Sequence, residues 1–478
     1  MLSASSLPQL TNLPSVLELL LFCTLFYYIV RTIYNLYFHP LSKFPGPKIA
    51  TFGEGYICWL TYKGQFTWDV DALHRKYGPV VRIAPNQLSF SGPTYQGGDV
   101  KPNLVTETDI TRHGNLRKLY AHAFSTKALQ KQEEIVQGHI HGFLRQLHTL
   151  GNTNDDLDMS KWFELVTFDV ISDLTFGESF GSVQSGIHHP IVSVILENVI
   201  YGTQLGVAAR VAPILKPLIA VFSRDMREKR SRFLDYTRKA ILKRMRIETT
   251  RKDLMDNVLK AEELKQFDED DLLSKAQILL IAGSETTATF AAGVTYWLFK
   301  SPGACAKVQK EVRERYSSVK DITSSTVGSL PYLNAVVEEG LCIFPPVPLH
   351  LDRISPGATV DGEFIPRGTR VAVNCVSATR NAIHFHDPDS FIPERWLDPE
   401  LSDVKSVSQP FIMGPRVCIG RNFALMEMRL LLAKIHFLFD LEYVGRKNLD
   451  WDRDVMMWTL WKKPELMVKF KLREGVSL

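Results

Sequence analysis

The sequence has few cysteines and no excess of charge of either sign. Six cysteines are spread over 478 residues, and no two of them form a Cys-x-x-Cys pair, so neither a disulfide framework nor a structural zinc site is expected. The 56 Lys and Arg residues against 52 Asp and Glu residues give a net charge of +4, which is too balanced to indicate a nucleic-acid-binding protein. With 45% hydrophobic and 23% charged residues, the composition is that of a globular protein.

The chain also lacks internal repeats, low-complexity blocks and any linker that would divide its body. Long stretches with helical periodicity alternate with short strand-like stretches. Helices are expected over 161–174, 233–247, 272–300 and 304–316. Strands are expected over 80–83, 87–90, 359–360 and 371–373. The sequence therefore predicts one mainly α-helical domain over residues 41–478, with a small β-sheet portion.

One long apolar run stands near the start of the chain. Residues 13–30 are nearly all apolar, and about 18 such residues are enough to span a membrane as a helix. Lys and Arg follow the run and do not precede it, which by the positive-inside rule places the body on the cytoplasmic side. A cleaved signal peptide would need a basic start and small residues at the cleavage site, and neither is present. Residues 1–40 are interpreted as a membrane anchor and hinge, with a buried core helix as the alternative.

A second stretch has some features of a membrane contact. Basic residues outnumber acidic ones over 224–252, where a solvated helix face and a contact with anionic lipids are both possible readings. The preceding stretch, 207–222, is mostly apolar and would suit a shallow membrane contact.

Cys418 is the most informative cysteine. It stands between Gly414 and Gly420 in a loop that leads into a helical pattern from residue 422. Backbone amides at a helix start stabilise a thiolate, and glycines let a loop approach a flat cofactor closely. Arg416 can pair with a carboxylate such as a haem propionate. On these residues alone, a haem ligand and a buried structural cysteine are equally supported.

The segment 411–420 (FIMGPRVCIG) resembles the haem-ligand signature of the cytochrome P450 monooxygenases. The matching residues are Phe411, Gly414, Arg416, Cys418 and Gly420. The segment 282–287 (AGSETT) resembles the oxygen-activation motif in the family's longest helix, and 391–396 (FIPERW) resembles its meander. The resemblance covers 40–478 and the anchor. It implies the cytochrome P450 fold and haem b, with Cys418 as the axial iron ligand that favours O–O bond cleavage.

The resemblance also implies roles for other residues. Thr286 would hold oxygen or a water molecule through its hydroxyl, and Glu285 would supply protons from bulk solvent. His113 and Arg117 occupy the places of the family's Trp-x-x-x-Arg, where they would bind a haem propionate, and Arg353 occupies another common propionate position. The alternative for Glu285 and Thr286 is a polar stripe on an apolar helix. The alternative for His113, Arg117 and Arg353 is that they are plain surface residues.

One position departs from the family pattern. The family carries Glu-x-x-Arg on the helix before the Pro345-Pro346 pair, whereas here Glu339 is followed three residues later by Cys342. The resemblance implies that Glu339 and the meander residue Arg395 support the haem loop. Because breaking a buried ion pair costs about 3–5 kcal/mol, we expect weaker haem retention unless Arg395 compensates, and Cys342→Arg is expected to raise haem occupancy.

The implied function is monooxygenation of a lipophilic small molecule. The pocket is expected to draw on 92–112, 198–207, 278–282, 347–351 and 456–460, which are apolar where they should lie nearest the iron. The segments 37–41 (YFHPL) and 387–391 (DPDSF) resemble fungal members that act in secondary-metabolite biosynthesis, on terpenoids, polyketides or alkaloids.

No dinucleotide-binding loop is present. The resemblance therefore implies electrons from NADPH through a separate membrane-bound cytochrome P450 reductase, and a catalytic domain facing the cytosol from the endoplasmic reticulum. The alternatives are a haem-deficient relative without activity and a redox-neutral haem-thiolate isomerase.

Overall fold

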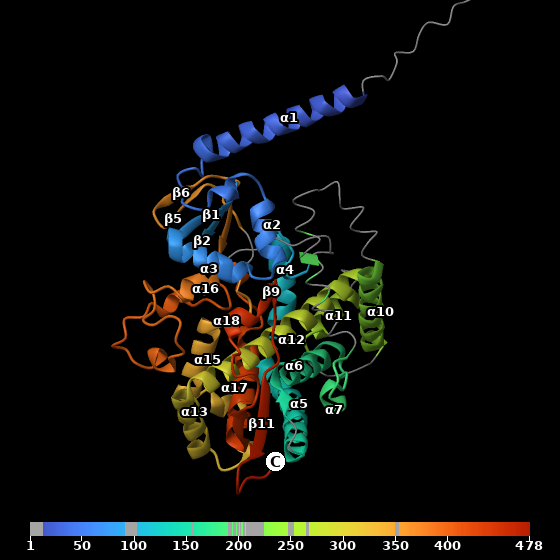
Figure 1. The fold of residues 1–478 in the computed structure, drawn as a ribbon. Coiled ribbons are helices and arrows are strands. Elements are labelled where there is room, and N and C mark those ends of the chain that lie inside the picture. Colours follow the sequence, from blue (N-terminus) through green and yellow to red (C-terminus); the bar gives the residue numbers. More distant parts are fainter. Residues whose placement is uncertain are drawn as a thin grey trace, which may run out of the picture.

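Helices make up most of the regular structure in the computed structural model (Figure 1). The structure describes residues 13–90, 103–153, 156–189, a few isolated positions between 194 and 206, 224–246, 253–263, 267–348 and 353–478. The expected membrane-contact stretch 207–222 lies outside the described residues, as do most of the expected pocket segments 92–112 and 198–207. The mainly α-helical fold with small sheets is confirmed.

The expected elements all appear, some with shifted ends. The helices are α1 (Leu13–Ile33), α2 (Gly55–Tyr62), α3 (Phe66–Tyr77), α4 (Ile110–Ala121), α5 (Thr126–Asn152), α6 (Met159–Phe176), α7 (Ser182–Ser185), α10 (Arg224–Arg246), α11 (Asp256–Glu263), α12 (Glu269–Lys300), α13 (Pro302–Arg315), α14 (Ser324–Val327), α15 (Pro331–Ile343), α16 (Cys375–Thr379), α17 (Arg421–Leu438) and α18 (Trp451–Asp454). The strands are β1 (Val80–Ala84), β2 (Gln87–Phe90), β3 (Leu157–Asp158), β4 (Arg353–Ile354), β5 (Ala358–Val360), β6 (Glu363–Ile365), β7 (Arg370–Val373), β8 (Phe439–Tyr443), β9 (Met456–Trp458), β10 (Leu460–Lys462) and β11 (Met467–Leu472).

The described strands form four small sheets, and two of these have more than two strands. One has the strand order β1-β2-β7-β4, in which β2 and β7 are parallel and Leu88 pairs with Val371. It lies at the end of the molecule nearest α1 (Figure 1). The other has the order β3-β11-β8, and it brings the C-terminal part of the chain against the start of α6, where β3 ends.

Helix α12 runs through the centre of the molecule (Figure 1). Its start is fixed by a capping box, in which Asp268 accepts a hydrogen bond from the Asp271 amide at 2.8 Å and Asp271 accepts one from the Asp268 amide at 3.3 Å. Helix α6 crosses α12 at Gly283, where an added Cβ would lie 2.5 Å from the Ile171 side chain. Gly283 therefore allows the two helices to pack closely.

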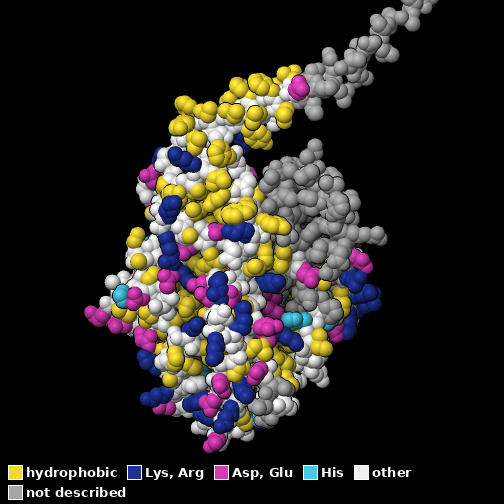
Figure 2. All heavy atoms as spheres, in the orientation of Figure 1, with side chains coloured by type: hydrophobic (Ala, Val, Ile, Leu, Met, Phe, Trp, Pro, Cys, Tyr) yellow, Lys and Arg dark blue, Asp and Glu magenta, His cyan; other side chains and the backbone are white. Residues whose placement is uncertain are grey.

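The apolar helix α1 projects from the body (Figure 1), and the large apolar side chains described on it are exposed (Figure 2). The segment Glu18–Phe38 is long and apolar enough to cross a membrane, and only 6% of its apolar window is buried. Helix α12 also passes this test of length and composition, but 72% of its window is buried, which makes it a core helix. The alternative of a buried core helix at the start of the chain is thus excluded, and α1 is a candidate membrane span.

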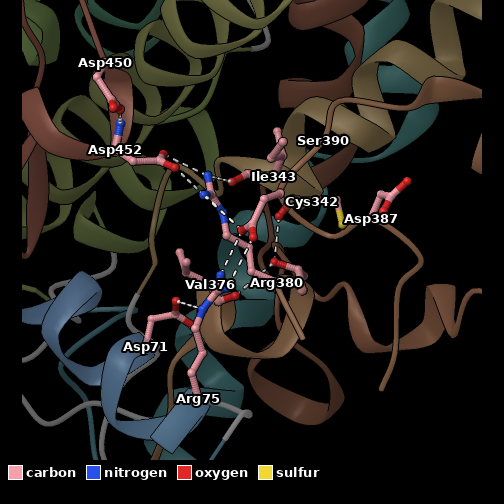
Figure 3. Close-up of polar contacts among 12 residues, drawn as sticks. Asp71, Arg75, Cys342, Ile343, Val376, Arg380, Asp387, Ser390, Asp450 and Asp452 are labelled. Carbon is pink, nitrogen blue, oxygen red and sulfur yellow. Dashed lines mark hydrogen bonds and ion pairs between the residues drawn. The ribbon is translucent and has the colours of Figure 1, made fainter. Parts of the chain in front are cut away.

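Arg380, directly after α16, joins three parts of the body (Figure 3). Its side chain is 4% exposed. The guanidinium donates hydrogen bonds to both carboxylate oxygens of Asp452 in α18, with 2.9 Å to Oδ1, and to the carbonyl of Ile343 at 3.1 Å. It also lies over the rings of Trp68 and Trp297, 5.1 and 5.8 Å from their centroids. Arg380 is therefore the buried connection between the ends of α15, α16 and α18.

We expect Arg380→Met to lower the free energy of unfolding by about 2–3 kcal/mol, because Asp452 and a buried carbonyl lose charge-assisted hydrogen bonds. Arg75→Met is the matched control. Arg75 also bonds two carboxylates, those of Asp71 and Asp389, but its side chain is 50% exposed, so the loss should stay below about 1 kcal/mol. Urea denaturation followed by tryptophan fluorescence measures both values. Equal losses would contradict the assigned role of Arg380.

Candidate active site

A large cavity lies between α12 and the loop that precedes α17. It has about 1540 Å³ of space free of protein atoms, including the part that opens to solvent. The volume that compares with the roughly 300–1000 Å³ of typical small-molecule sites, the space open to the centre of a water-sized sphere, is about 310 Å³. Most of its lining is apolar, and the apolar side chains include Leu104, Ile171, Ile278, Leu279, Val347 and Phe411.

The Cys418 loop forms one wall of this cavity. The loop is closed by a hydrogen bond from the Cys418 amide to the carbonyl of Phe411 at 2.8 Å. Gly414 has a φ of +76°, a left-handed conformation that favours glycine. Burial raises the pKa of the Cys418 thiol, whereas hydrogen bonds from the backbone amides of Gly420 and Arg421 lower it. These amides belong to the start of α17, so they are placed to stabilise a thiolate.

Basic side chains gather at one end of the cavity. His113 and Arg117 of α4 and Arg416 of the cysteine loop all line it. Arg117 donates to the carbonyl of Val417 at 2.7 Å, and Arg416 donates to the carbonyl of Glu107 at 2.7 Å. These bonds fix both guanidinium groups to the backbone at the cavity edge.

The electrostatics of this basic cluster indicate an excess of positive charge. The pKa of His113 is lowered by burial, by the charges of Arg416 and Arg117, and more weakly by Arg353. Burial and Arg416 also lower the pKa of Arg353, which lies near the cluster without lining the cavity. Two carboxylates bound beside these cations would offset the repulsion between their positive charges. A deep apolar cavity with a thiol on its wall and cations at one end fits haem with its two propionates.

The structure separates the two expected oxygen-activation residues. Thr286 lines the cavity, and its hydroxyl donates to the carbonyl of Ala282 at 2.6 Å. Glu285 faces away from it, toward α6, and accepts a hydrogen bond from Lys463 at 3.1 Å. Lys463 also donates to Thr289 at 3.2 Å. The polar pair is therefore divided between the cavity side and the buried side of α12.

The buried Glu339 keeps a cationic partner. Arg395 donates to its Oε1 at 3.2 Å, as does the amide of Ile392 at 2.8 Å, and Trp396 donates to Oε2 at 2.8 Å. Burial raises the pKa of Glu339, and Arg395 offsets part of that rise. Arg395 and the indole of Trp396 thus bind the Glu339 carboxylate without the arginine that the family carries at the position of Cys342.

Cys342 itself occupies a closed site. Its side chain is buried, and its carbonyl accepts a hydrogen bond from Thr379 at 2.8 Å. The Glu339 carboxylate acts on its thiol and raises its pKa, and the cations Arg395 and Arg380 act on it more weakly in the opposite direction. An arginine here would add volume and a further positive charge. A rise in haem occupancy in Cys342→Arg therefore stays a prediction, in which an added cation beside Glu339 is set against the added volume and charge.

The roles of three buried polar residues at or near the site were not predicted from the sequence. Lys463 and Trp396 reach Glu285 and Glu339 only through the fold, 178 and 57 residues away along the chain. Glu427 of α17 is fully buried; burial raises the pKa of its carboxyl to about 8, although a hydrogen bond with Thr287 lowers it. The signal that could have identified it is its position among apolar residues of the helix (RNFALMEMRLLLAKIHFL).

Comparisons with known proteins agree with this geometry. A family model described as Cytochrome P450 matches residues 89–470. The chain is 36% identical to Cytochrome P450 monooxygenase ORF9 of Penicillium roqueforti, covering 98% of this chain and 95% of the relative. It is also 35% identical to Cytochrome P450 monooxygenase BOT4 of Botryotinia fuckeliana (91% and 88% covered) and 36% identical to the Trichothecene C-4 hydroxylase of Trichoderma arundinaceum (92% and 94% covered). The chain belongs to the cytochrome P450 monooxygenase family, whose members carry a haem-thiolate iron.

Proposed function

We propose that the protein inserts one oxygen atom from O₂ into a lipophilic small molecule, by hydroxylation or epoxidation. The observation that carries the proposal is that the Cys418 thiol and the Thr286 hydroxyl line one mostly apolar cavity. Haem bound there would supply oxygen activation, and Cys418 would bind its iron. His113, Arg117 and Arg416 would hold the propionates, with Arg353 adding positive charge nearby.

The remaining residues of the site act on substrate and protons. Ile278, Ala282 and Val347 offer an apolar surface near Thr286, which favours a substrate without charge there. Thr286 would orient a water molecule or oxygen through its hydroxyl, and Glu285 would supply protons from behind the helix. Glu339 and Arg395 would hold the meander in place and so support the cysteine loop.

The similarity to fungal proteins supports a role in secondary-metabolite biosynthesis, with a terpenoid, polyketide or alkaloid as substrate. One relative is named for hydroxylation of trichothecene at C-4, which is an oxygen insertion at one defined carbon. An apolar cavity together with a candidate membrane anchor supports a substrate that partitions into membranes.

The proposed setting is the endoplasmic reticulum membrane, with the catalytic domain 41–478 in the cytosol and residues 1–40 as anchor and hinge. Exposed aromatic residues continue from α1 onto the adjacent surface, where Phe52, Trp59 and Tyr62 are 52–61% exposed, and Figure 2 shows apolar side chains on this part of the body. Electrons would come from NADPH through a separate cytochrome P450 reductase. The exposed Lys118 and Lys127 would favour an acidic partner.

Turnover in membranes tests this proposal. Membranes containing the protein and a reductase are supplied with NADPH, ¹⁸O₂ and a panel of lipophilic terpenoids, polyketides and alkaloids. A product that carries a single ¹⁸O atom and requires NADPH supports the proposal. A product formed without NADPH would indicate the redox-neutral isomerase instead. Absence of haem from the purified protein would indicate the inactive relative.

Thr286→Val is expected to lower product formation by about 10²-fold, because the variant loses the hydroxyl that assists proton delivery. NADPH consumption should fall much less, so that the product formed per NADPH decreases. Thr295→Val is the matched control, since Thr295 donates the same kind of bond to the carbonyl of Ala291 on the same helix, at 2.7 Å, but is buried outside the cavity. Unchanged product yield per NADPH in Thr286→Val would contradict the role of Thr286.

A further inference from the structure

A row of titratable side chains leads from the protein surface to Glu285. His188 Nε2 lies 3.0 Å from Glu164 Oε2, Glu164 Oε1 lies 2.8 Å from Lys463 Nζ, and Lys463 Nζ lies 3.1 Å from Glu285 Oε2. The exposed fraction of the side chain is 29% for His188 and 17% for Glu164, but 1% for Lys463 and 5% for Glu285. The row connects solvent with the residue that precedes Thr286 on α12.

The fold holds Lys463 in this buried position. Lys463 lies in the segment between β10 and β11, and that segment is bonded to the start of α6. Ser160 donates its hydroxyl hydrogen to the carbonyl of Pro464 at 2.7 Å, and the amide of Leu466 donates to Asp158 at 2.9 Å. These bonds keep the ammonium group between α6 and α12, within reach of a carboxylate from each helix.

The charges in the row determine which carboxyl binds a proton. Glu164 and Glu285 share a single ammonium, so the group carries a net charge of −1 unless one carboxyl is protonated or His188 is charged. Burial raises the pKa of Glu285; Lys463 lowers it, and the charge of Glu164 raises it again. Burial also acts to raise the pKa of Glu164, but Lys463 and His188 outweigh it and bring that pKa to about 2. Glu285 is therefore the carboxyl that binds and releases a proton.

Three groups outside α12 act on Glu285, each from a different part of the fold: Lys463 from the C-terminal segment, Glu164 from α6 and His188 from the loop after α7. Asp158, at the start of α6, is a further carboxyl that interacts with Glu164.

We propose that His188, Glu164 and Lys463 are positioning residues that take up protons from solvent and pass them to Glu285. Protonated His188 gives its proton to the Glu164 carboxylate, which passes it to Lys463 as Lys463 gives its own proton to the Glu285 carboxylate, and His188 then takes a new proton from water. Every group except Glu285 returns to its starting form, and solvent has lost one proton. A turn of the Glu285 side chain then carries the proton to the Thr286 side of α12. This inference rests on the proposed monooxygenase function, which consumes protons at the cavity.

Infrared titration of the full-length protein in detergent tests this proposal without turnover. The carboxylic-acid band of Glu285 is assigned by its loss in Glu285→Gln, which separates it from the band of the buried Glu427. In Glu164→Gln one negative charge is removed and Lys463 pairs with Glu285 alone. The titration midpoint of the Glu285 band should therefore move down by about one pH unit, a tenfold lower proton affinity.

Lys463→Gln should move the same midpoint upward, because Glu285 loses its cation and keeps the repulsion of Glu164. The matched control is Asp173→Asn, which removes a second His–carboxylate contact of α6, 2.7 Å between His139 Nε2 and Asp173 Oδ2. It should leave the midpoint unchanged. Opposite shifts of the midpoint in Glu164→Gln and Lys463→Gln support the proposed proton transfer through the row. No shift, or shifts in the same direction, would overturn the proposal.

The pH dependence of turnover gives the second test. In Glu164→Gln, the pH above which the product formed per NADPH falls should move down together with the infrared midpoint. If that pH stays at the wild-type value, protons do not reach Glu285 through this row. His188→Gln should slow product formation while leaving the midpoint nearly in place. Failure of the proposed function is detected separately, because the wild type would then form no oxygenated product at any pH.

Discussion

Cys418→Ser is expected to abolish the red-shifted Soret band of the reduced, carbon monoxide-bound protein. The same change should lower product formation by about 10³-fold or more, equivalent to about 4 kcal/mol of transition-state stabilisation. The physical reason is the ligand: a thiolate donates electron density to the iron in this family, and a serine hydroxyl does not. Absorption spectroscopy of isolated membranes measures the first effect, and turnover with NADPH measures the second.

Serine is the appropriate replacement because it keeps the backbone geometry of the loop. The bond from the amide of residue 418 to the carbonyl of Phe411 remains possible, so the variant is expected to fold. Cys305→Ser is the control, since Cys305 is a partly exposed cysteine on α13 and its replacement should leave the spectrum unchanged. A red-shifted band that persisted in Cys418→Ser would show that another residue ligates the iron.

Local sequence signals predicted the parts of the site that depend on neighbours in the chain. The loop around Cys418 needs a left-handed residue at Gly414, and that requirement is visible in the sequence as glycine. The start of α12 is likewise visible, because the acids from Asp268 onward suit the positive end of a helix. Such features are encoded within a few residues, so they could be predicted before the fold was known.

The contacts that decide the electrostatics were not predictable in this way. The partner of Glu285 is Lys463, and the second partner of Glu339 is Trp396. Lys463 has no distinctive local pattern, and the meander motif that contains Trp396 does not reveal that its indole bonds Glu339. The role of Gly283 in helix packing also depends on α6. Buried charge pairing is a property of the tertiary fold, and sequence alone gave only the residues that need a partner.

Arg395→Met is expected to lower the free energy of unfolding by about 3–5 kcal/mol and to cause loss of haem during purification. Arg395 pairs with Glu339 at 3.2 Å and with Asp403 at 2.9 Å, and all three side chains are 2% exposed. Removing the cation leaves two buried carboxylates without it, which is far costlier than losing a surface ion pair. Urea denaturation gives the first quantity, and the ratio of haem to protein absorbance gives the second.

The pH dependence distinguishes this electrostatic cause from simple loss of packing. In Arg395→Met, burial should raise the pKa of Glu339 further, because Arg395 is the charge that now lowers it. The folded variant then binds more protons than the unfolded chain, so its stability should increase as the pH falls from about 8 to about 5. Lys307→Met, which removes the partner of the neighbouring Glu394 at the surface, should cost less than about 1 kcal/mol. A large loss in Arg395→Met that did not change with pH would indicate that packing, and not the buried charge, holds the meander against α15.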